Sequence, residues 1–425
     1  MARFLMMTQP YPGHVTPSAP IARKLVERGH EIVWIAGRRF QEKVEATGAR
    51  FHPLPKERDP NEMEVYDFHP ELKDVKGLAQ IKCWLKHIFL DGCFAEIAVI
   101  DEVLADFPAD VLLGDSVALG LYFRAEMGGL PSACISLLPG SMPSRDTAPY
   151  GLGLLPGTGV LAKMRNGLLN LLVNRILLRD VTTYANKVRE RLGLAPLDGP
   201  FMAAMPRKIS LIMQLSTGVF EYPRSDLPGH IHKIGPILPE PDPAFAPPGW
   251  WADLDTAEAV ILVNQGTIAN VLEDLIVPTI EALRDEPMLI VTVPVKEGQL
   301  TGLPPNVRAE PFVPFNRLLP HVDVMVTNGG YGGTQQALAY GIPLVVAGET
   351  EDKREVAARV QWSGAGINLK KHRPSPQAVR KAVQRVLSEP EYRENARRIQ
   401  ADFAQHDAPT RAAELLETLA HGDTP

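Results

Sequence analysis

The segment 325–341, MVTNGGYGGTQQALAYG, is the stretch that decides the kind of fold this chain adopts. Four glycines follow an apolar, strand-like run and precede a helix-like one. Strand, glycine turn and helix in that order bring unpaired backbone N–H groups and the positive end of a helix dipole to one point. Such a point binds anions, most often phosphate. A tight turn without a ligand is the alternative, since the segment is neither GxGxxG nor a P-loop.

The pattern of this segment recurs along the chain. Strand-like runs lie at 3–8, 31–37 and 109–115, separated by a predicted helix at 16–30 with Thr16 as its N-cap and by an amphipathic stretch at 77–105. After residue 258 the runs are at 259–266, 288–294, 307–312, 322–330 and 342–348. Strands that alternate with helices predict an α/β fold with parallel sheets covered on both faces.

Two units of this kind are expected. The chain has 425 residues, more than one core usually serves. The stretch at 235–251, GPILPEPDPAFAPPGWW, cannot join a sheet centrally, because its prolines lack backbone donors. We therefore predict an N-terminal domain at 1–234, a linker at 235–256, a C-terminal domain at 257–408, and at 409–425 a helix and tail that pack back on the first domain.

Composition excludes several classes of protein. A formal net charge of -6 with both signs interspersed gives no basic field for nucleic acid. No apolar run is long enough for integral membrane association, and the early run ends at Pro10 and Pro12, so it is no signal peptide. The three cysteines lack the spacing of a disulfide framework or a zinc site. A cytoplasmic protein without a bound metal is expected.

Two polar residues mark the edge of the first predicted sheet. His14 follows the first strand, and Asp115 ends a later strand of the same domain. The carboxyl ends of parallel strands share one edge, so the carboxylate could orient the imidazole and stabilise its protonated form. A structural histidine and an aspartate that caps a helix are the alternatives.

Two further features lie near the glycine turn. Gly266 and Thr267 follow the first strand of the second domain, where ligands of open α/β sheets bind. Phe312 could offer a flat face to a base, or could simply belong to the core.

The segment 312–366 resembles the donor-binding signature of the nucleotide-sugar glycosyltransferases of the GT-B fold. The resemblance is to the antibiotic and macrolide type, which is related to the UDP-glycosyltransferases. PYPGHVTPSAPIARKLVERGHEI, DVLLGDSVALGLYFRAEMGGLPSACIS and VNQGT also fall in the expected order, so it covers nearly the whole chain. It implies GT-B architecture, in which two Rossmann-like βα domains face each other across a cleft.

The resemblance also implies roles for single residues. The catalytic base and its partner would be His14 and Asp115. Phe312 would stack on the nucleobase, the backbone of Val313 would contact the base edge, and Asp352 would bind donor sugar hydroxyls. The remaining donor-binding positions would be Gly13, Thr267, Gly330, Gly333 and Thr334.

Three donor positions depart from the family pattern. Asn328 replaces a histidine that donates to the phosphate, and its neutral amide makes a weaker bond than a charged donor. Gln336 stands where a glutamate usually holds the ribose hydroxyls, and Lys353 stands where a glutamine usually follows the sugar-binding aspartate. Donor affinity and sugar identity depend on these positions, and the fold does not.

The resemblance implies an inverting, metal-independent transfer of a sugar from a UDP- or dTDP-sugar to a hydroxyl of an apolar small molecule, such as a polyketide, a phenolic or another secondary metabolite. No cofactor is expected besides this donor, and the chain would be a monomer or homodimer. The leucine-rich helix at 161–178 would be core packing or a wall of the acceptor pocket. Two alternatives remain: a catalytically silent partner or activator of another glycosyltransferase, and a nucleotide-sugar epimerase.

Overall fold

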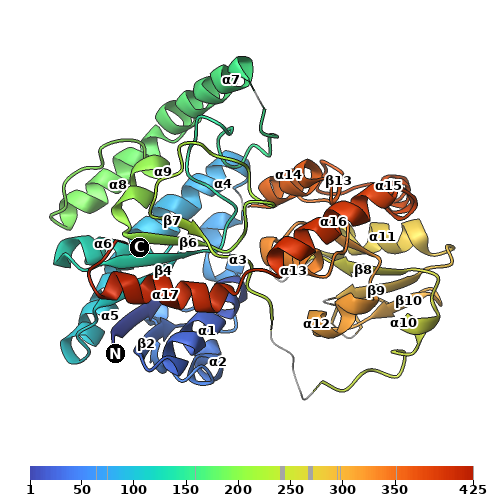
Figure 1. The fold of residues 1–425 in the computed structure, drawn as a ribbon, viewed down its shortest axis with the longest axis horizontal. Helices are drawn as coiled ribbons and strands as arrows, with labels where there is room; N and C mark the ends of the chain where they lie inside the picture. The colour runs from blue at the N-terminus through green and yellow to red at the C-terminus, as the bar shows by residue number, and fades with distance from the viewer. Residues whose placement is uncertain are drawn as a thin grey trace.

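Two parallel β-sheets, each covered by helices, form the molecule (Figure 1). The computed structural model describes residues 1–63, 65–73, 75–157, 159–239, 245–266, 271–293, 295–296, 298–350 and 352–424. The predicted fold class, two parallel-sheet α/β domains, is confirmed.

Seven strands form the first sheet, in the order β3-β2-β1-β4-β5-β6-β7, and six form the second, in the order β10-β9-β8-β11-β12-β13. Every strand pair is parallel. The strands are β1 (Arg3–Met7), β2 (Glu31–Ala36), β3 (Arg50–Pro53), β4 (Val111–Asp115), β5 (Ser132–Ser136), β6 (Leu211–Gln214), β7 (Ile231–Lys233), β8 (Val260–Asn264), β9 (Leu289–Val293), β10 (Val307–Ala309), β11 (Val324–Thr327), β12 (Leu344–Val346) and β13 (Gly366–Asn368).

The helices alternate with these strands. They are α1 (Pro12–Glu27), α2 (Gln41–Glu45), α3 (Val65–Phe68), α4 (Gly77–Cys83), α5 (Asp91–Asp106), α6 (Leu119–Gly128), α7 (Val160–Leu171), α8 (Arg179–Arg191), α9 (Phe201–Ala204), α10 (Asp253–Thr256), α11 (Ile276–Leu283), α12 (Phe315–Leu318), α13 (Tyr331–Ala339), α14 (Lys353–Ser363), α15 (Pro376–Ser388), α16 (Pro390–Phe403) and α17 (Ala408–Ala420). Two π-helical turns, Trp84–Leu90 and Leu172–Leu177, continue α4 and α7.

The start of α1 differs from the sequence prediction. The predicted N-cap, Thr16, is wrong, because the helix begins at Pro12 and Tyr11 occupies the N-cap position with extended backbone. Proline suits the first helical position, where its missing N–H costs no hydrogen bond. The earlier start places His14 in the first turn of α1 instead of in the loop before it.

Both sheets have the doubly wound strand order, in which the second and third strands lie on one side of the first strand and the fourth strand lies on its other side. In the first sheet this switch point lies between β1 and β4, and in the second it lies between β8 and β11. Ligands of open α/β sheets bind outside the carboxyl ends of the strands at this point. The predicted catalytic pair follows β1 and ends β4, and the glycine turn follows β11.

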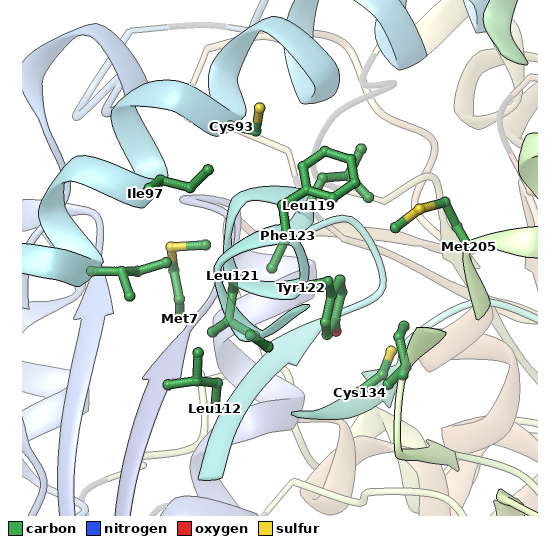
Figure 2. Close-up of a cluster of buried hydrophobic side chains, with 14 of the residues drawn as sticks. Met7, Cys93, Ile97, Leu112, Leu119, Leu121, Tyr122, Phe123, Cys134 and Met205 are labelled. Carbon is green, nitrogen blue, oxygen red and sulfur yellow. The ribbon is translucent and has the colours of Figure 1, made fainter. Parts of the chain in front are cut away.

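A layer of apolar side chains holds α5 and α6 against the first sheet (Figure 2). Tyr122 of α6 belongs to this layer, and its hydroxyl donates to the backbone oxygen of Asp115 at 2.6 Å. Its burial and the surrounding groups raise the pKa of Tyr122 well above its usual value, so the phenol stays protonated. The core therefore fixes the end of β4, where the predicted catalytic aspartate lies.

A residue before the predicted linker in sequence is buried in the second unit. Phe220 follows β6 of the first sheet, yet it is fully buried in the core of the second unit, where its ring stacks on Tyr331 of α13. The last helix, α17, packs in the core of the first sheet together with α1. Arg28 and His30 bind Glu417 of α17 at 2.7 and 2.8 Å.

The leucine-rich stretch at 161–178 does not have the burial that core packing requires. Leu161, Met164 and Leu168 of α7 are exposed, so the core-packing prediction is wrong for these side chains. Within the described ranges, no helix combines the length and the apolar character needed to cross a membrane.

Candidate active site

The histidine and the aspartate predicted to act together form a hydrogen bond. Nδ1 of His14 lies 2.9 Å from Oδ2 of Asp115, and the exposed fraction of the two side chains is 27% and 0%. A buried carboxylate is an acceptor, so it selects the tautomer in which Nδ1 carries the proton. Nε2 is then the ring atom that can take a proton.

The carboxylate of Asp115 is held from several sides. Oδ2 also accepts the backbone N–H of Gln9 at 2.6 Å, and Oδ1 accepts the backbone N–H of Val117 at 2.9 Å. Burial opposes ionisation, but attraction to His14 and these hydrogen bonds outweigh it and hold the pKa of Asp115 below its usual value. The pair therefore presents an ionised, fixed carboxylate to the imidazole.

Asp115 does not cap the following helix, so that alternative prediction is wrong. The next helix, α6, begins at Leu119 with Ala118 at the N-cap position, and no side chain caps it. The bond from Val117 closes a local turn two residues beyond the aspartate.

Asn328 lies at the switch point of the second sheet, directly after β11. Its side-chain amide donates to the backbone oxygen of Gln265, which follows β8, and its own N–H donates to the oxygen of Asn264 at 3.3 Å. The side-chain oxygen has no partner within the described residues. Asn328 thus joins the two loops that the sequence predicts on either side of a diphosphate.

The glycines after Asn328 have two different reasons to be glycine. Gly329 has a φ of 89°, and a Cβ there would lie 2.9 Å from Cγ1 of Val346. At Gly330 and Gly332 a Cβ would meet nothing within 4 Å. Gly329 is therefore required by the fold, whereas the space beside Gly330 and Gly332 lets a ligand approach the backbone.

Helix α13 begins directly after Gly330, and no side chain caps its N-terminus. The N–H groups of its first turn, from Tyr331 to Gly333, lie outside the intrahelical ladder. Thr334 is fully buried, and its hydroxyl has no partner in the described part of the chain. The backbone donors of this turn, rather than that hydroxyl, are open for an anion.

The two residues predicted to contact the nucleobase differ in exposure. Phe312 has an exposed fraction of 69%, so the core alternative is wrong for it. Val313 is buried in the core of the second unit. A buried neighbour fixes the backbone of this segment and leaves the aromatic ring at the surface.

The other predicted donor positions are divided between the two units. Asp352 is the N-cap residue of α14, and Lys353 is buried, with its Nζ 3.0 Å from the hydroxyl oxygen of Thr350. Gln336 is half-buried in α13. Gly13 is exposed in the first turn of α1, and Thr267 lies outside the described residues.

A small pocket lies at this edge of the second sheet. Its lining includes Gln265, Asn328 and Lys353 from the predicted donor region, together with Asp274 and His372. Asp274 binds Nε2 of His372 at 3.0 Å. The structure therefore gathers Asn328 and Lys353 around one hollow, although they are 25 positions apart in the sequence.

Sequence reasoning missed a buried polar network between the two units. Arg359 of α14 is fully buried and binds Glu221 and Glu355, each at 3.0 Å. Burial alone would lower the pKa of Arg359, but these carboxylates and Tyr222 raise it. Tyr331, the first residue of α13, donates to Glu221 at 2.7 Å. The network links the two helices that begin at the glycine turn and at Asp352.

The same network reaches the glycine-rich loop before α7. Oε1 of Glu355 accepts the backbone N–H groups of Gly151 and Gly153, both at 2.9 Å. The sequence signal for these contacts is weak, because Glu355 and Arg359 are spaced as an ordinary helical ion pair. Nothing in the sequence alone indicates that the pair is buried between two units.

Comparison with known proteins agrees with this arrangement. Residues 279–419 match the family described as Erythromycin biosynthesis protein CIII-like, C-terminal domain. The chain is 42% identical to a 4'-demethylrebeccamycin synthase of Lentzea aerocolonigenes, over 98% of this chain and 99% of that protein. This chain belongs to the GT-B glycosyltransferases of the antibiotic and macrolide type.

Other glycosyltransferases support the assignment. A UDP-glycosyltransferase 2 of Phaeomoniella chlamydospora is 31% identical over 98% of this chain and 95% of that protein. The crystal structure of CalG4, the calicheamicin glycosyltransferase, covers all of both chains with a TM-score of 0.76 at 22% identity, so it supports the fold alone. The protein is thus a glycosyltransferase that uses a nucleotide-sugar donor, as the sequence resemblance implied.

Proposed function

We propose that this glycosyltransferase inverts the anomeric centre, needs no metal, and uses His14 as general base to move a sugar from a UDP- or dTDP-sugar to a hydroxyl of an apolar small molecule. The observation that carries the proposal is the hydrogen bond of 2.9 Å between His14 and the buried Asp115 at the switch point of the first sheet. A residue pair of this kind serves proton transfer, and a binding protein has no need of it.

The proton step follows from the tautomer that Asp115 selects. Nε2 of His14 takes the proton of the acceptor hydroxyl as the acceptor oxygen bonds to the anomeric carbon. The bond from that carbon to the phosphate oxygen breaks, and the nucleoside diphosphate leaves with the electron pair. Asp115 stabilises the imidazolium that forms, and a single displacement inverts the anomeric centre.

The donor diphosphate would bind at the other switch point. The N–H groups of the first turn of α13 and the positive end of its dipole would face the diphosphate there. Asn328 contributes a neutral amide and keeps the loop after β8 in place through Gln265. These groups would stabilise the charge on the leaving diphosphate.

The nucleobase would stack on Phe312, whose ring is exposed beside the buried Val313. The name of the Phaeomoniella chlamydospora relative supports UDP as the nucleotide. A spinosyn rhamnosyltransferase with the same fold has been solved with thymidine diphosphate, which supports dTDP. The relative that makes 4'-demethylrebeccamycin supports a secondary metabolite as acceptor.

The test compares the wild type with His14→Ala. Turnover should fall by about 10² to 10⁴-fold, the usual contribution of a general base, while calorimetry shows nearly unchanged binding of UDP or dTDP. A variant with full activity would contradict the role of His14. A wild type that binds neither nucleotide and turns over no donor would favour the silent partner instead.

A further inference from the structure

Helix α7 and the π-helical turn after it face the protein with their polar side. Asn166 is fully buried, and Asn174, eight positions further along the chain, is also buried. Between them, Asn170 donates its side-chain amide to the backbone oxygens of Ser144 and Thr147 at 3.0 and 3.1 Å. These asparagines are spaced by four residues and therefore lie on one face.

The opposite side of the same helix is apolar and exposed. Six of the apolar side chains on this side have exposed fractions between 41% and 83%: Val160, Leu161, Met164, Leu168, Leu171 and Leu172. At roughly 100° per residue they cover a stripe about 120° wide. A surface helix of a globular protein normally packs such a stripe against the core. Here the polar side of the helix packs against the protein, and the apolar stripe is exposed.

The position of α7 makes this side accessible. In Figure 1 the helix projects from the first unit and ends away from both sheets. A contiguous apolar surface of this kind marks an interaction site.

The charge around the stripe points to the kind of partner. From Thr147 to Arg179 the sequence has four basic residues and no acidic residue, although the whole chain has a net charge of -6. Asp146 and Asp180 border this stretch, and Oδ1 of Asp146 lies 3.8 Å from Nζ of Lys163. The four basic side chains are exposed: Lys163, Arg165, Arg175 and Arg179. A helix that combines an exposed apolar stripe with basic side chains is typical of segments that lie in the interface of an anionic lipid bilayer.

We propose that the α7 face, which comprises the six apolar and four basic side chains named above, docks the protein on an anionic lipid surface. The apolar side chains would enter the boundary between headgroups and acyl chains, and the basic ones would meet lipid phosphates. A second copy of the chain fits less well, because a symmetric contact through this face would bring the basic residues of both copies together. The inference concerns attachment and is independent of the proposed transfer reaction.

The test is co-sedimentation of the full chain with two kinds of vesicle, pure phosphatidylcholine and a mixture of phosphatidylcholine with phosphatidylglycerol. The wild type should bind the anionic vesicles roughly tenfold better or more, and added salt should weaken the binding. The triple variant Leu161→Ser, Met164→Ser, Leu168→Ser should lose at least about tenfold in binding. Arg175→Glu with Arg179→Glu should abolish the preference for anionic vesicles.

The matched control replaces exposed apolar side chains elsewhere, Met127→Ser with Val271→Ser, and should bind as the wild type does. Circular dichroism confirms that each variant is folded. A wild type that does not sediment with anionic vesicles would overturn the proposal. So would light scattering that shows a dimer of the wild type and a monomer of the triple variant, because a second copy would then occupy the face.

Discussion

The two switch points of the molecule have the same topology and different chemistry. At the first, between β1 and β4, the carboxylate of Asp115 accepts three hydrogen bonds, one of them from Nδ1 of His14. At the second, between β8 and β11, the groups are the neutral amide of Asn328 and the backbone N–H groups of the first turn of α13. Within the described residues, the side-chain oxygens of Asn328 and Thr334 have no partner.

This difference teaches that one strand order can support two tasks. Proton transfer needs a fixed donor and acceptor pair, and burial of the carboxylate supplies it. Anion binding needs unpaired donors and room for close approach, and glycines at a helix N-terminus supply these. The predictions below separate the two tasks by substitution.

The largest expected effect is at Asp115→Asn. The amide would place a donor against at least one backbone N–H and would no longer fix the tautomer of His14, so turnover should fall about 10²-fold or more. Unfolding should become easier by about 1–3 kcal/mol. Steady-state kinetics and urea unfolding check both effects.

The stability difference should also depend on pH. The pKa of Asp115 is lowered in the folded state, so its stabilising contribution is complete above about pH 4 and is lost as the pH falls through the folded value. Wild type and Asp115→Asn should therefore converge in stability in acid. A gap that widens below pH 4 would contradict the assignment of the lowered pKa.

Two neighbouring glycines should respond in opposite ways. Gly330→Ala puts a methyl group into open space, so the unfolding free energy should hardly change, while affinity for UDP or dTDP should fall by about tenfold or more from a lost hydrogen bond to the diphosphate. Gly329 has a positive φ, and an added Cβ would meet Val346, so Gly329→Ala should lose about 1–3 kcal/mol of stability. Calorimetric titration and thermal melting distinguish them. Unchanged affinity in Gly330→Ala would place the diphosphate elsewhere.

The nucleobase position should affect nucleotide binding without affecting stability. Phe312→Ala should leave Tm unchanged, because the ring is exposed, and should weaken nucleotide binding by roughly 5- to 100-fold through lost stacking. Val313→Ala is the control, since this side chain is buried and its loss should cost about 1–3 kcal/mol of stability. Equal nucleotide affinity in Phe312→Ala and wild type would remove the stacking role.

The sequence predicted the strands that carry strong apolar runs, such as β1, β8 and β11. It missed β3, β5, β6, β7 and β13. These strands have three to five residues, and β5, SACIS, is made mostly of small side chains, so they show no clear apolar run or period. The start of α1 was also missed, because Pro12 opens a helix as readily as it belongs to a loop.

The candidate site was predictable where one rule sufficed. Carboxyl ends of parallel strands share an edge, so His14 and Asp115 could be paired from sequence although they are 101 positions apart. The contact of Arg359 with Glu221, 138 positions away, could not be predicted in this way, because it depends on how the two units dock. The burial of Thr334 likewise depends on the packing of α13 and not on its motif.

The most direct test of the central claim compares the effect of His14→Ala on acceptors of different acidity. Acceptors would come from a screen of apolar aglycones, paired so that one hydroxyl is a weakly acidic alcohol or phenol and the other a nitrophenol that ionises near neutral pH. A general base matters less when the acceptor is already ionised, so the loss should be about 10² to 10⁴-fold with the first and should shrink strongly with the second. An equal loss with both acceptors would contradict a base at His14.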